Sequence, residues 1–283
     1  MANILSLKRR IQTAQNVSKT TRAMQMIAAS KLKKAQDAAL SSRPYVDKLT
    51  EVSMNLSSSV DKENLHRYMK GNHGEYSLVI VISPDKGLAG SLISNILKEV
   101  INSEEKNTMY IAIGKKAENF LVRLRKNVIA TFPFGTTLPS FDIVFPVIKI
   151  IDEQFTLGKV SNVKLLYSKF QSIFYQKPQI IPILPIKLPA EIKRDEKMLF
   201  EPNIKSLLPS LLSHFLEMTI YQNILETYAS EQAARMIAMK NATDNAKEII
   251  EELKLEYNKG RQEKITNEIL DIAGTTIALQ YEE

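Results

Sequence analysis

Apolar or small residues recur every three or four positions along the first part of this chain of 283 residues. The recurring positions are Ile4, Leu7, Ile11, Ala14, Val17, Thr21, Met24, Ala28, Leu32, Ala35 and Ala39. This spacing is close to a heptad repeat, and it predicts a long helix with one apolar stripe over residues 1–60. Pro44 removes a backbone donor, but the pattern resumes after it, so we expect a kink or a local adjustment there.

The end of the chain, residues 203–283, has a second helical pattern. Neither proline nor glycine occurs between Leu211 and Gly260. Small residues step by four along one face, namely Ala234, Ala238, Ala242 and Ala246. Small side chains let a neighbouring helix approach closely. We therefore expect the two terminal helices to pair antiparallel, which buries both stripes.

The middle of the chain, residues 75–190, alternates short β-branched runs with helical segments. Strands are predicted over residues 76–83, 110–113, 128–131, 163–168 and 180–186, with helices at 88–102, 114–126 and 141–158. Pro182 and Pro185 restrict the last strand to an edge of the sheet. The predicted fold class is α/β, with a long antiparallel coiled coil of the terminal helices and an inserted small, open, Rossmann-like domain.

Composition excludes several classes of site. Hydrophobic residues make up 44% and charged residues 24%, as in ordinary soluble proteins, and no apolar run reaches the ~18–20 residues that span a bilayer. The absence of cysteine excludes disulfides and thiolate metal sites. The net charge is +7, and residues 1–50 alone hold an excess of +8. This asymmetry indicates an acidic partner, whether nucleic acid, a membrane surface or an acidic protein loop.

Catalytic patterns are weak along the whole chain. No P-loop is present, and the turn at residues 84–90 has two glycines where the dinucleotide fingerprint requires three. That turn therefore favours a structural or protein-contact role over phosphate binding. His214 lies in an apolar helical stretch, where a satisfied core or interface histidine is the better interpretation. We expect no catalytic residues, no metal site and no bound cofactor.

The basic N-terminal helix leaves two alternatives open. Its first 44 residues contain no aromatic side chain on which a base would stack, which favours an acidic protein surface over nucleic acid. One alternative is a free-standing coiled-coil scaffold or nucleic-acid-binding protein that uses this helix, and the other is a small α/β enzyme with helical extensions.

Three segments carry a resemblance to a known family. Residues 7–36, 230–248 (SEQAARMIAMKNATDNAKE) and 257–268 (YNKGRQEKITNE) resemble the gamma subunit of F-type ATP synthases. The turn at residues 85–90 is similar to that family's Asp-Arg-Gly-Leu-Cys-Gly, with Ala89 in place of cysteine. The resemblance spans nearly the whole chain.

The resemblance implies a central rotor shaft without bond chemistry of its own. The shaft stands inside a ring of alternating alpha and beta subunits, and its α/β foot rests, with the epsilon subunit, on the membrane ring of c subunits. Proton flow turns the ring, and the turning shaft drives the beta sites through different nucleotide affinities. The resemblance implies no nucleic-acid partner, and membrane association only through the complex. Because the match begins within the first residues, we expect no transit peptide and a place on the cytoplasmic face of a bacterial inner membrane.

The resemblance also assigns contact residues. Arg261 and Gln262 match a pair that hydrogen-bonds a catch loop of beta, and Thr266 and Glu268 follow on the same segment. Positions that face an acidic loop of beta are matched by Arg235, Met24, Asp85, Lys86, Gly87 and Leu88. A stretch near the c ring is matched by Phe200, Glu201 and Pro202. Gly260 replaces a usual alanine, which costs about 0.5–1 kcal/mol of helix stability.

Overall fold

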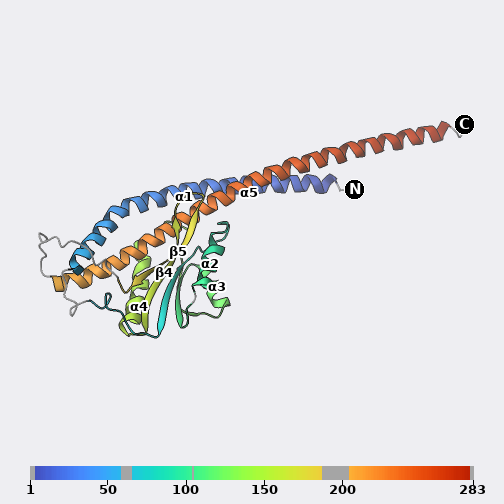
Figure 1. Ribbon diagram of the computed structural model, residues 1–283. Helices are drawn as coiled ribbons and strands as arrows, with labels where there is room; N and C mark the ends of the chain where they lie inside the picture. Colours follow the sequence, from blue (N-terminus) through green and yellow to red (C-terminus); the bar gives the residue numbers. More distant parts are fainter. Residues whose placement is uncertain (1–3, 59–65, 104, 187–203, 281–283) are drawn as a thin grey trace. The chain divides into compact units, whose positions relative to one another are not determined.

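The computed structural model describes residues 4–58, 66–103, 105–186 and 204–280. The chain forms two compact units, one of Met1–Ile27 with Met236–Glu283 and one of Ala28–Arg235. Two long helices, α1 (Ile4–Ser58) and α5 (Ile204–Gln280), run through both units (Figure 1). The boundary between the units therefore falls within helices. The predicted division into residues 1–60, 75–190 and 203–283 follows the order of elements instead, and it stays a prediction.

The first unit is an antiparallel pair of helices. The hydroxyl groups of Thr21 and Thr243 lie 2.7 Å apart, and a Cβ placed on Gly260 would be 3.8 Å from Cγ1 of Ile4. Earlier residues of α1 thus meet later residues of α5, as the sequence predicted. In this unit the buried line on α5 consists of Met239, Thr243, Ala246 and Leu253. Its steps of three, four and seven residues are those of a coiled-coil seam.

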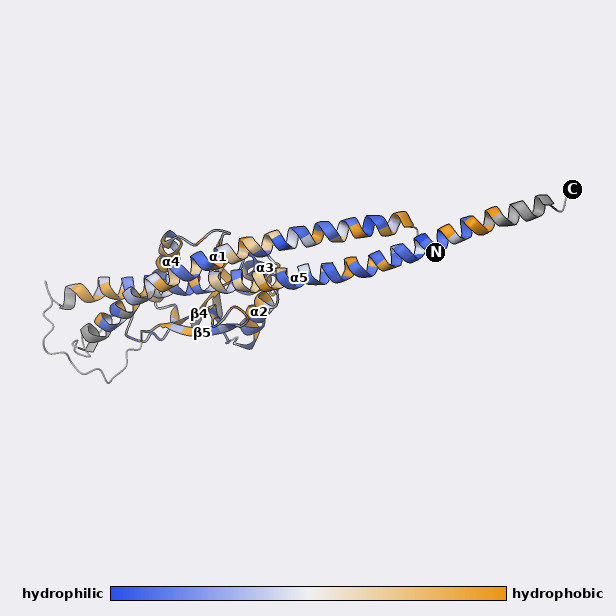
Figure 2. Ribbon diagram, turned by 90° about the horizontal axis from the view of Figure 1, so that it is seen from above, coloured by the Kyte–Doolittle hydropathy of each residue, from blue (hydrophilic) through white to orange (hydrophobic). Residues whose placement is uncertain are grey.

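The end of α5 continues past this pairing. Residues 261–270 are all exposed, including the apolar Ile265, Ile269 and Leu270. Figure 1 shows this end of α5 extending beyond the N-terminus of α1, and Figure 2 shows hydrophobic positions interspersed along it. Within the described residues of this unit, the last part of α5 has no helix of its own chain to pack against.

The second unit contains a five-stranded sheet in the order β3-β2-β1-β4-β5. Its strands are β1 (Tyr76–Ile82), β2 (Thr108–Ile113), β3 (Asn127–Phe132), β4 (Val160–Phe170) and β5 (Gln176–Leu184). The pairs β1–β2, β1–β4 and β2–β3 are parallel, and β5 pairs antiparallel with β4 at the edge. The strand β5 lies at the edge of the sheet, which confirms the prediction. Pro178 and Pro182 are tolerated there, because they have no N–H to donate to a further strand.

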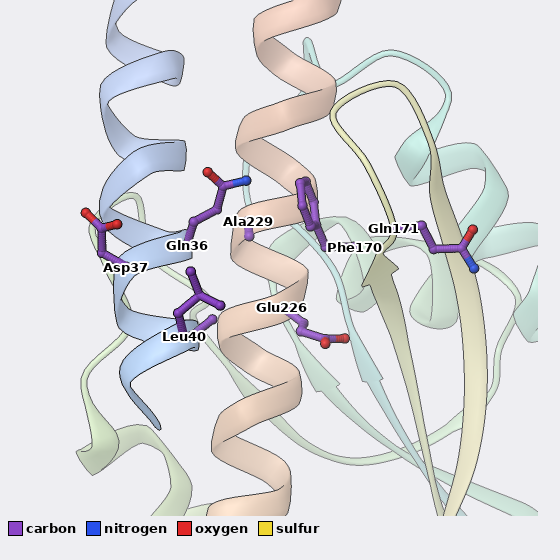
Figure 3. A pocket seen from close by; sticks show the side chains of 8 residues that line it. Gln36, Asp37, Leu40, Phe170, Gln171, Glu226 and Ala229 are labelled. Atoms are coloured by element: carbon purple, nitrogen blue, oxygen red, sulfur yellow. The ribbon is translucent and has the colours of Figure 1, made fainter. Parts of the chain in front are cut away.

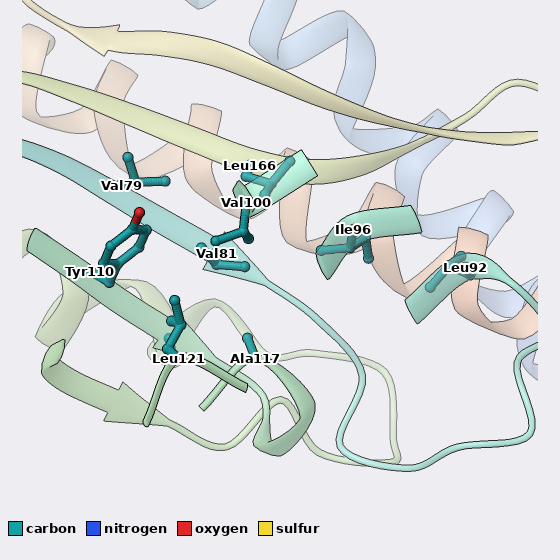
Figure 4. Close-up of a cluster of buried hydrophobic side chains, with 10 residues drawn as sticks. Val79, Val81, Leu92, Ile96, Val100, Tyr110, Ala117, Leu121 and Leu166 are labelled. Carbon is teal, nitrogen blue, oxygen red and sulfur yellow. The ribbon is translucent and has the colours of Figure 1, made fainter. Parts of the chain in front are cut away.

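Helices cover the sheet, which accounts for the continuous apolar runs of its central strands. They are α2 (Leu92–Asn102), α3 (Lys115–Arg123), a short 3-10 turn η2 (Phe141–Ile143) and α4 (Val144–Thr156). Figure 4 shows the core on one face, where Ile96 and Val100 of α2 and Leu121 of α3 pack against Val81 and Tyr110. The predicted α/β fold with an inserted open sheet is confirmed.

The helix α5 docks on the end of β4 through hydroxyl groups. The pairing of β1 with β4 ends at Val81 and Leu166, so Ser168 lies beyond the last β1 partner. Its N–H donates to Oγ1 of Thr227 (3.3 Å), and its carbonyl accepts from Oγ of Ser230 (2.9 Å). Two side chains of α5 thus satisfy backbone groups that a longer β1 would have paired, which removes the cost of burying them unsatisfied.

Pro44 does not end α1. The helix is continuous through it, and α1 contacts α5 on both sides. Oγ of Ser42 donates to Oε1 of Gln222 (2.6 Å), and the Tyr45 hydroxyl lies 2.7 Å from Nε2 of His214. These contacts show that His214 bonds within the helix pair, as expected for a satisfied histidine.

Gly114 gives a stability prediction. It is the N-cap residue of α3 with φ of 105°, and an added Cβ would lie 1.9 Å from the carbonyl oxygen of Ser83. Gly114→Ala is expected to destabilise the chain by more than about 1 kcal/mol, because alanine neither adopts this conformation nor fits the space. Gly87→Ala is the control, since Gly87 has open space around it and no positive φ. Thermal unfolding followed by circular dichroism measures both, and equal midpoints for the two variants would contradict the argument.

Candidate functional site

The turn after β1 is anchored by the carboxylate of Asp85. Oδ1 accepts from the N–H groups of Lys115 (2.8 Å) and Phe134 (3.3 Å), and Oδ2 accepts from the N–H of Gly135 (2.8 Å). The carboxylate thus joins the turn to the start of α3 and to the segment after β3. Asp85 was predicted as a partner contact, yet its carboxylate oxygens already bond to backbone donors of its own chain.

Leu88 is the most prominent side chain of this turn. It adopts φ of 62°, which is costly for a leucine, and it is 61% exposed. Lys86 is exposed beside it, and Ala89 is buried beneath. Strain kept at a protruding apolar side chain is typical of a contact site.

Arg235 connects α5 to the same turn. Its Nη2 donates to Oε1 of Glu231 (2.6 Å) and to the carbonyl of Gly87 (3.3 Å). The side chains of Arg235 and Glu231 are only 13% and 4% exposed, so this ion pair is mostly removed from water. The structure therefore brings Arg235 and the turn together, two features that the sequence analysis predicted to share one partner.

Glu231 is a buried carboxylate at this site that the sequence analysis did not single out. Burial raises the pKa of its carboxyl, while Arg235 and, more weakly, Lys31 oppose the rise and Asp85 adds to it. Its Oε2 is buried without a hydrogen-bond partner among the described residues. The available signal was the spacing of Glu231 and Arg235, four residues apart on one helix face, where opposite charges meet.

The other predicted contacts on described residues lie in the helix-pair unit. Met24 is half-buried on α1, whereas the four predicted positions near the end of α5 are exposed. Thr266 donates to the carbonyl of Gln262 (2.9 Å), and Glu268 pairs with Lys264 at 3.5 Å. A shallow hollow on this helix is lined by both Gln262 and Thr266, which therefore share a face. The predicted contacts near the end of α5 are thus all open to a partner, namely Arg261, Gln262, Thr266 and Glu268.

Three predicted contacts lie outside the described residues: Phe200, Glu201 and Pro202.

A hollow of about 400 Å³ lies between α1, the end of β4 and α5. In Figure 3, Asp37 points away from α5, whereas Glu226 extends from α5 on the side away from α1. The two carboxylates do not converge as an acid–base pair would. Among the described residues, no cluster of His, Asp or Glu is arranged to hold a metal ion, and no helix is long and apolar enough to cross a bilayer.

Comparison with known proteins gives the family. The sequence model of the ATP synthase family matches residues 3–279. An ATP synthase gamma chain from Dehalococcoides mccartyi (strain CBDB1) is 41% identical over 286 residues, covering 99% of this chain and 100% of that one. One from Roseiflexus castenholzii is 37% identical and covers 99% of each. The chain belongs to the ATP synthase gamma chain family.

Solved structures share the gamma chain fold. A chain of the Euglena gracilis mitochondrial ATP synthase (OSCP/F1/c-ring) superimposes with a TM-score of 0.69 at 18% identity, covering 97% of this chain and 94% of that one. A chain of the Tetrahymena thermophila mitochondrial ATP synthase central stalk and c ring gives 0.59 at 22% identity, covering 79% and 99%. The family resemblance found in the sequence is confirmed.

The buried ion pair predicts unequal effects of single and double substitutions. Arg235→Met leaves the Glu231 carboxylate buried without a cation and is expected to cost about 3–5 kcal/mol of unfolding free energy. Adding Glu231→Gln removes that uncompensated charge and restores most of the loss. Lys264→Met is the control, because its pair with Glu268 is exposed and such pairs contribute about 0–1 kcal/mol. Urea unfolding measures all three. Additive losses in the double variant would show that the two residues do not interact.

The raised pKa of Glu231 predicts a pH dependence. Because the folded-state pKa lies above the ordinary value of 4.5, the folded chain holds an extra proton between the two values. The contribution of Glu231 to stability is therefore largest below pH 4.5 and is lost as the pH rises through the folded-state pKa. The difference in unfolding free energy between the wild type and Glu231→Gln should fall as the pH increases above 4.5. A difference that grows with pH would contradict this sign.

Proposed function

We propose that this chain is the central rotor shaft of an F-type ATP synthase. In this role it couples rotation of the membrane c ring to conformational cycling of the catalytic beta subunits. The observation that carries the proposal is the match to gamma chains over essentially the whole length, at 41% identity. The chain has no catalytic role of its own in this proposal, and it binds no cofactor.

The helix α5 suits the transmission of torque. It is one uninterrupted helix from Ile204 to Gln280, so it passes from the α/β unit into the helix pair without a loop. At the α/β unit it is fixed to β4 through Thr227 and Ser230, and to the turn after β1 through Arg235. A force applied to the sheet is therefore transferred to α5 through these contacts.

The exposed end of α5 suits a bearing inside a ring of other subunits. Ile265 is 46% exposed, and Ile269 and Leu270 are both more than half exposed. Apolar surface of this kind marks a protein contact. We assign the surrounding surface to the alpha and beta subunits, with Arg261 and Gln262 bonding to a loop of beta.

The remaining contacts follow from the same proposal. Arg235, Met24 and the turn at residues 85–88 meet an acidic loop of beta. Residues 75–190 form the foot, which stands with epsilon on the c ring. The helices of residues 1–60 and 203–283 form the shaft. The complex holds the chain at the cytoplasmic face of a bacterial inner membrane, so its membrane association is indirect.

Arg261 and Gln262 give the test of this function. In a complex reconstituted with alpha, beta, epsilon and the c ring, Arg261→Ala and Gln262→Ala should lower ATP hydrolysis and ATP-driven proton pumping several-fold. The reason is that a hydrogen bond to a charged group contributes about 1.5–3 kcal/mol. Lys254→Ala is the control, as an exposed cation on the same helix.

The outcomes separate the function from the residue roles. Failure of the wild-type chain to assemble with alpha and beta would refute the rotor function. Normal assembly together with unchanged coupling in both variants would refute only the assigned contact.

A further inference from the structure

The β4–β5 hairpin ends in an exposed apolar turn. This turn, residues 172–175, is called the hairpin tip below. Phe174 is 81% exposed, Tyr175 55% and Ile173 39%. Three large apolar side chains on consecutive residues are unusual at a tip that faces water, because such turns favour small polar residues.

The hairpin tip is nevertheless ordered by its own hydrogen bonds. The N–H of Ser172 donates to the carbonyl of Tyr175 (3.1 Å), and the N–H of Tyr175 donates back to the carbonyl of Ser172 (3.3 Å). The side-chain amide of Gln176 donates to the carbonyls of Ser172 (3.0 Å) and Ile173 (2.8 Å). A tip fixed in this way has already lost the conformational freedom that binding would otherwise cost.

Two lysines stand behind the tip. Lys169 of β4 lies directly opposite Lys177 of β5 in the register, and both are exposed. Like charges at directly opposite positions destabilise a strand pair. Neither lysine has an ion-pair partner among the described residues, and the segment from 169 to 177 contains no acidic residue. Carboxylates supplied from outside would relieve this repulsion.

We propose that the hairpin tip is a protein-docking element of this chain. It inserts Phe174 into an apolar groove on another subunit of the assembly, and Asp or Glu side chains at the rim of that groove pair with Lys169 and Lys177. The proposal rests on the rotor function above. An aromatic anchor surrounded by polar groups is the usual centre of a protein interface, and here Gln171, Ser172 and Gln176 provide the polar surroundings.

The fixed turn favours a protein over a lipid surface. Insertion into a fluid headgroup layer requires no defined backbone geometry, whereas a protein groove rewards a preformed one. Lys169 and Lys177 also lie on the strands behind the apolar turn, so they match a carboxylate rim around a groove that holds the tip.

A cross-linking experiment on the assembled complex tests the proposal. Phe174 is replaced by the photoreactive p-benzoylphenylalanine, and Val122 of α3, which is 59% exposed, is replaced in the same way as the matched control. We expect position 174 to cross-link to one site on another subunit, in a peptide that contains Asp or Glu, and position 122 not to reach that site. No subunit cross-link at 174, or cross-links to lipid only, would overturn the proposal.

Binding measurements provide the second readout. Phe174→Ser should weaken association of the chain with its partner subunits by about tenfold or more, whereas Val122→Ser should leave it unchanged. The double variant Lys169→Gln/Lys177→Gln should reduce the salt dependence of association. Circular dichroism of the free variants checks that they fold. Phe174→Ser should fold normally, because a side chain that is 81% exposed contributes little to the core.

The remaining outcomes also decide the matter. Assembly of the Phe174→Ser variant with wild-type affinity would overturn the docking proposal and leave the rotor function intact. Wild-type binding to phosphatidylglycerol vesicles that Phe174→Ser alone abolishes, with subunit affinity unchanged, would assign the tip to the membrane instead. A wild-type chain that does not assemble at all would refute the rotor function, and the docking proposal with it.

Discussion

The helix α5 touches the sheet at the point where β1 has already ended and β4 continues. The backbone of Ser168 would be buried there without partners, and the hydroxyls of Thr227 and Ser230 bond to it. A hydrogen bond of this kind is modest in net free energy, but leaving a buried backbone group unpaired is costly. The requirement that these groups stay paired fixes the position of α5 along β4. The contact of Arg235 with Gly87, less than two turns further along α5, depends on the same placement.

The Arg235–Glu231 pair adds a second constraint of a different kind. Both charges are largely removed from water, so each is tolerated only because the other is present. Burial raises the pKa of Glu231, because removing its charged form from water carries a desolvation cost. The buried ion pair that carries this desolvation cost lies where α5 meets the turn after β1, which bears the protruding Leu88. Arg235 therefore braces the turn from within its own chain, whether or not it also reaches a partner.

Several parts of this arrangement were accessible from the sequence, for identifiable reasons. β-Branched runs marked the strands, prolines placed β5 at the edge, and the three-and-four spacing marked both long helices. The antiparallel pairing followed from the need to bury two stripes at opposite ends of one chain. The exact buried face did not follow. The alanines at 238 and 242 are half-buried, while Met239 and Thr243 lie in the seam, because packing against the partner helix sets the rotation of a helix.

The candidate site was less accessible, because its contacts join residues far apart in the chain. The carboxylate of Asp85 accepts from the backbone N–H groups of residues 115, 134 and 135, and no local sequence pattern predicts such distant partners. Glu231 could not be predicted as buried, because a glutamate on a helix is ordinarily solvated.

The unequal length of the two helices has a mechanical consequence. Near Gly260 the helix α5 passes Ile4 at the start of α1, and beyond that point it continues as a single helix. One helix bends and twists more readily than two packed together. In a rotating shaft the single end would twist more under load than the paired helices beside it, and it would store strain between successive steps.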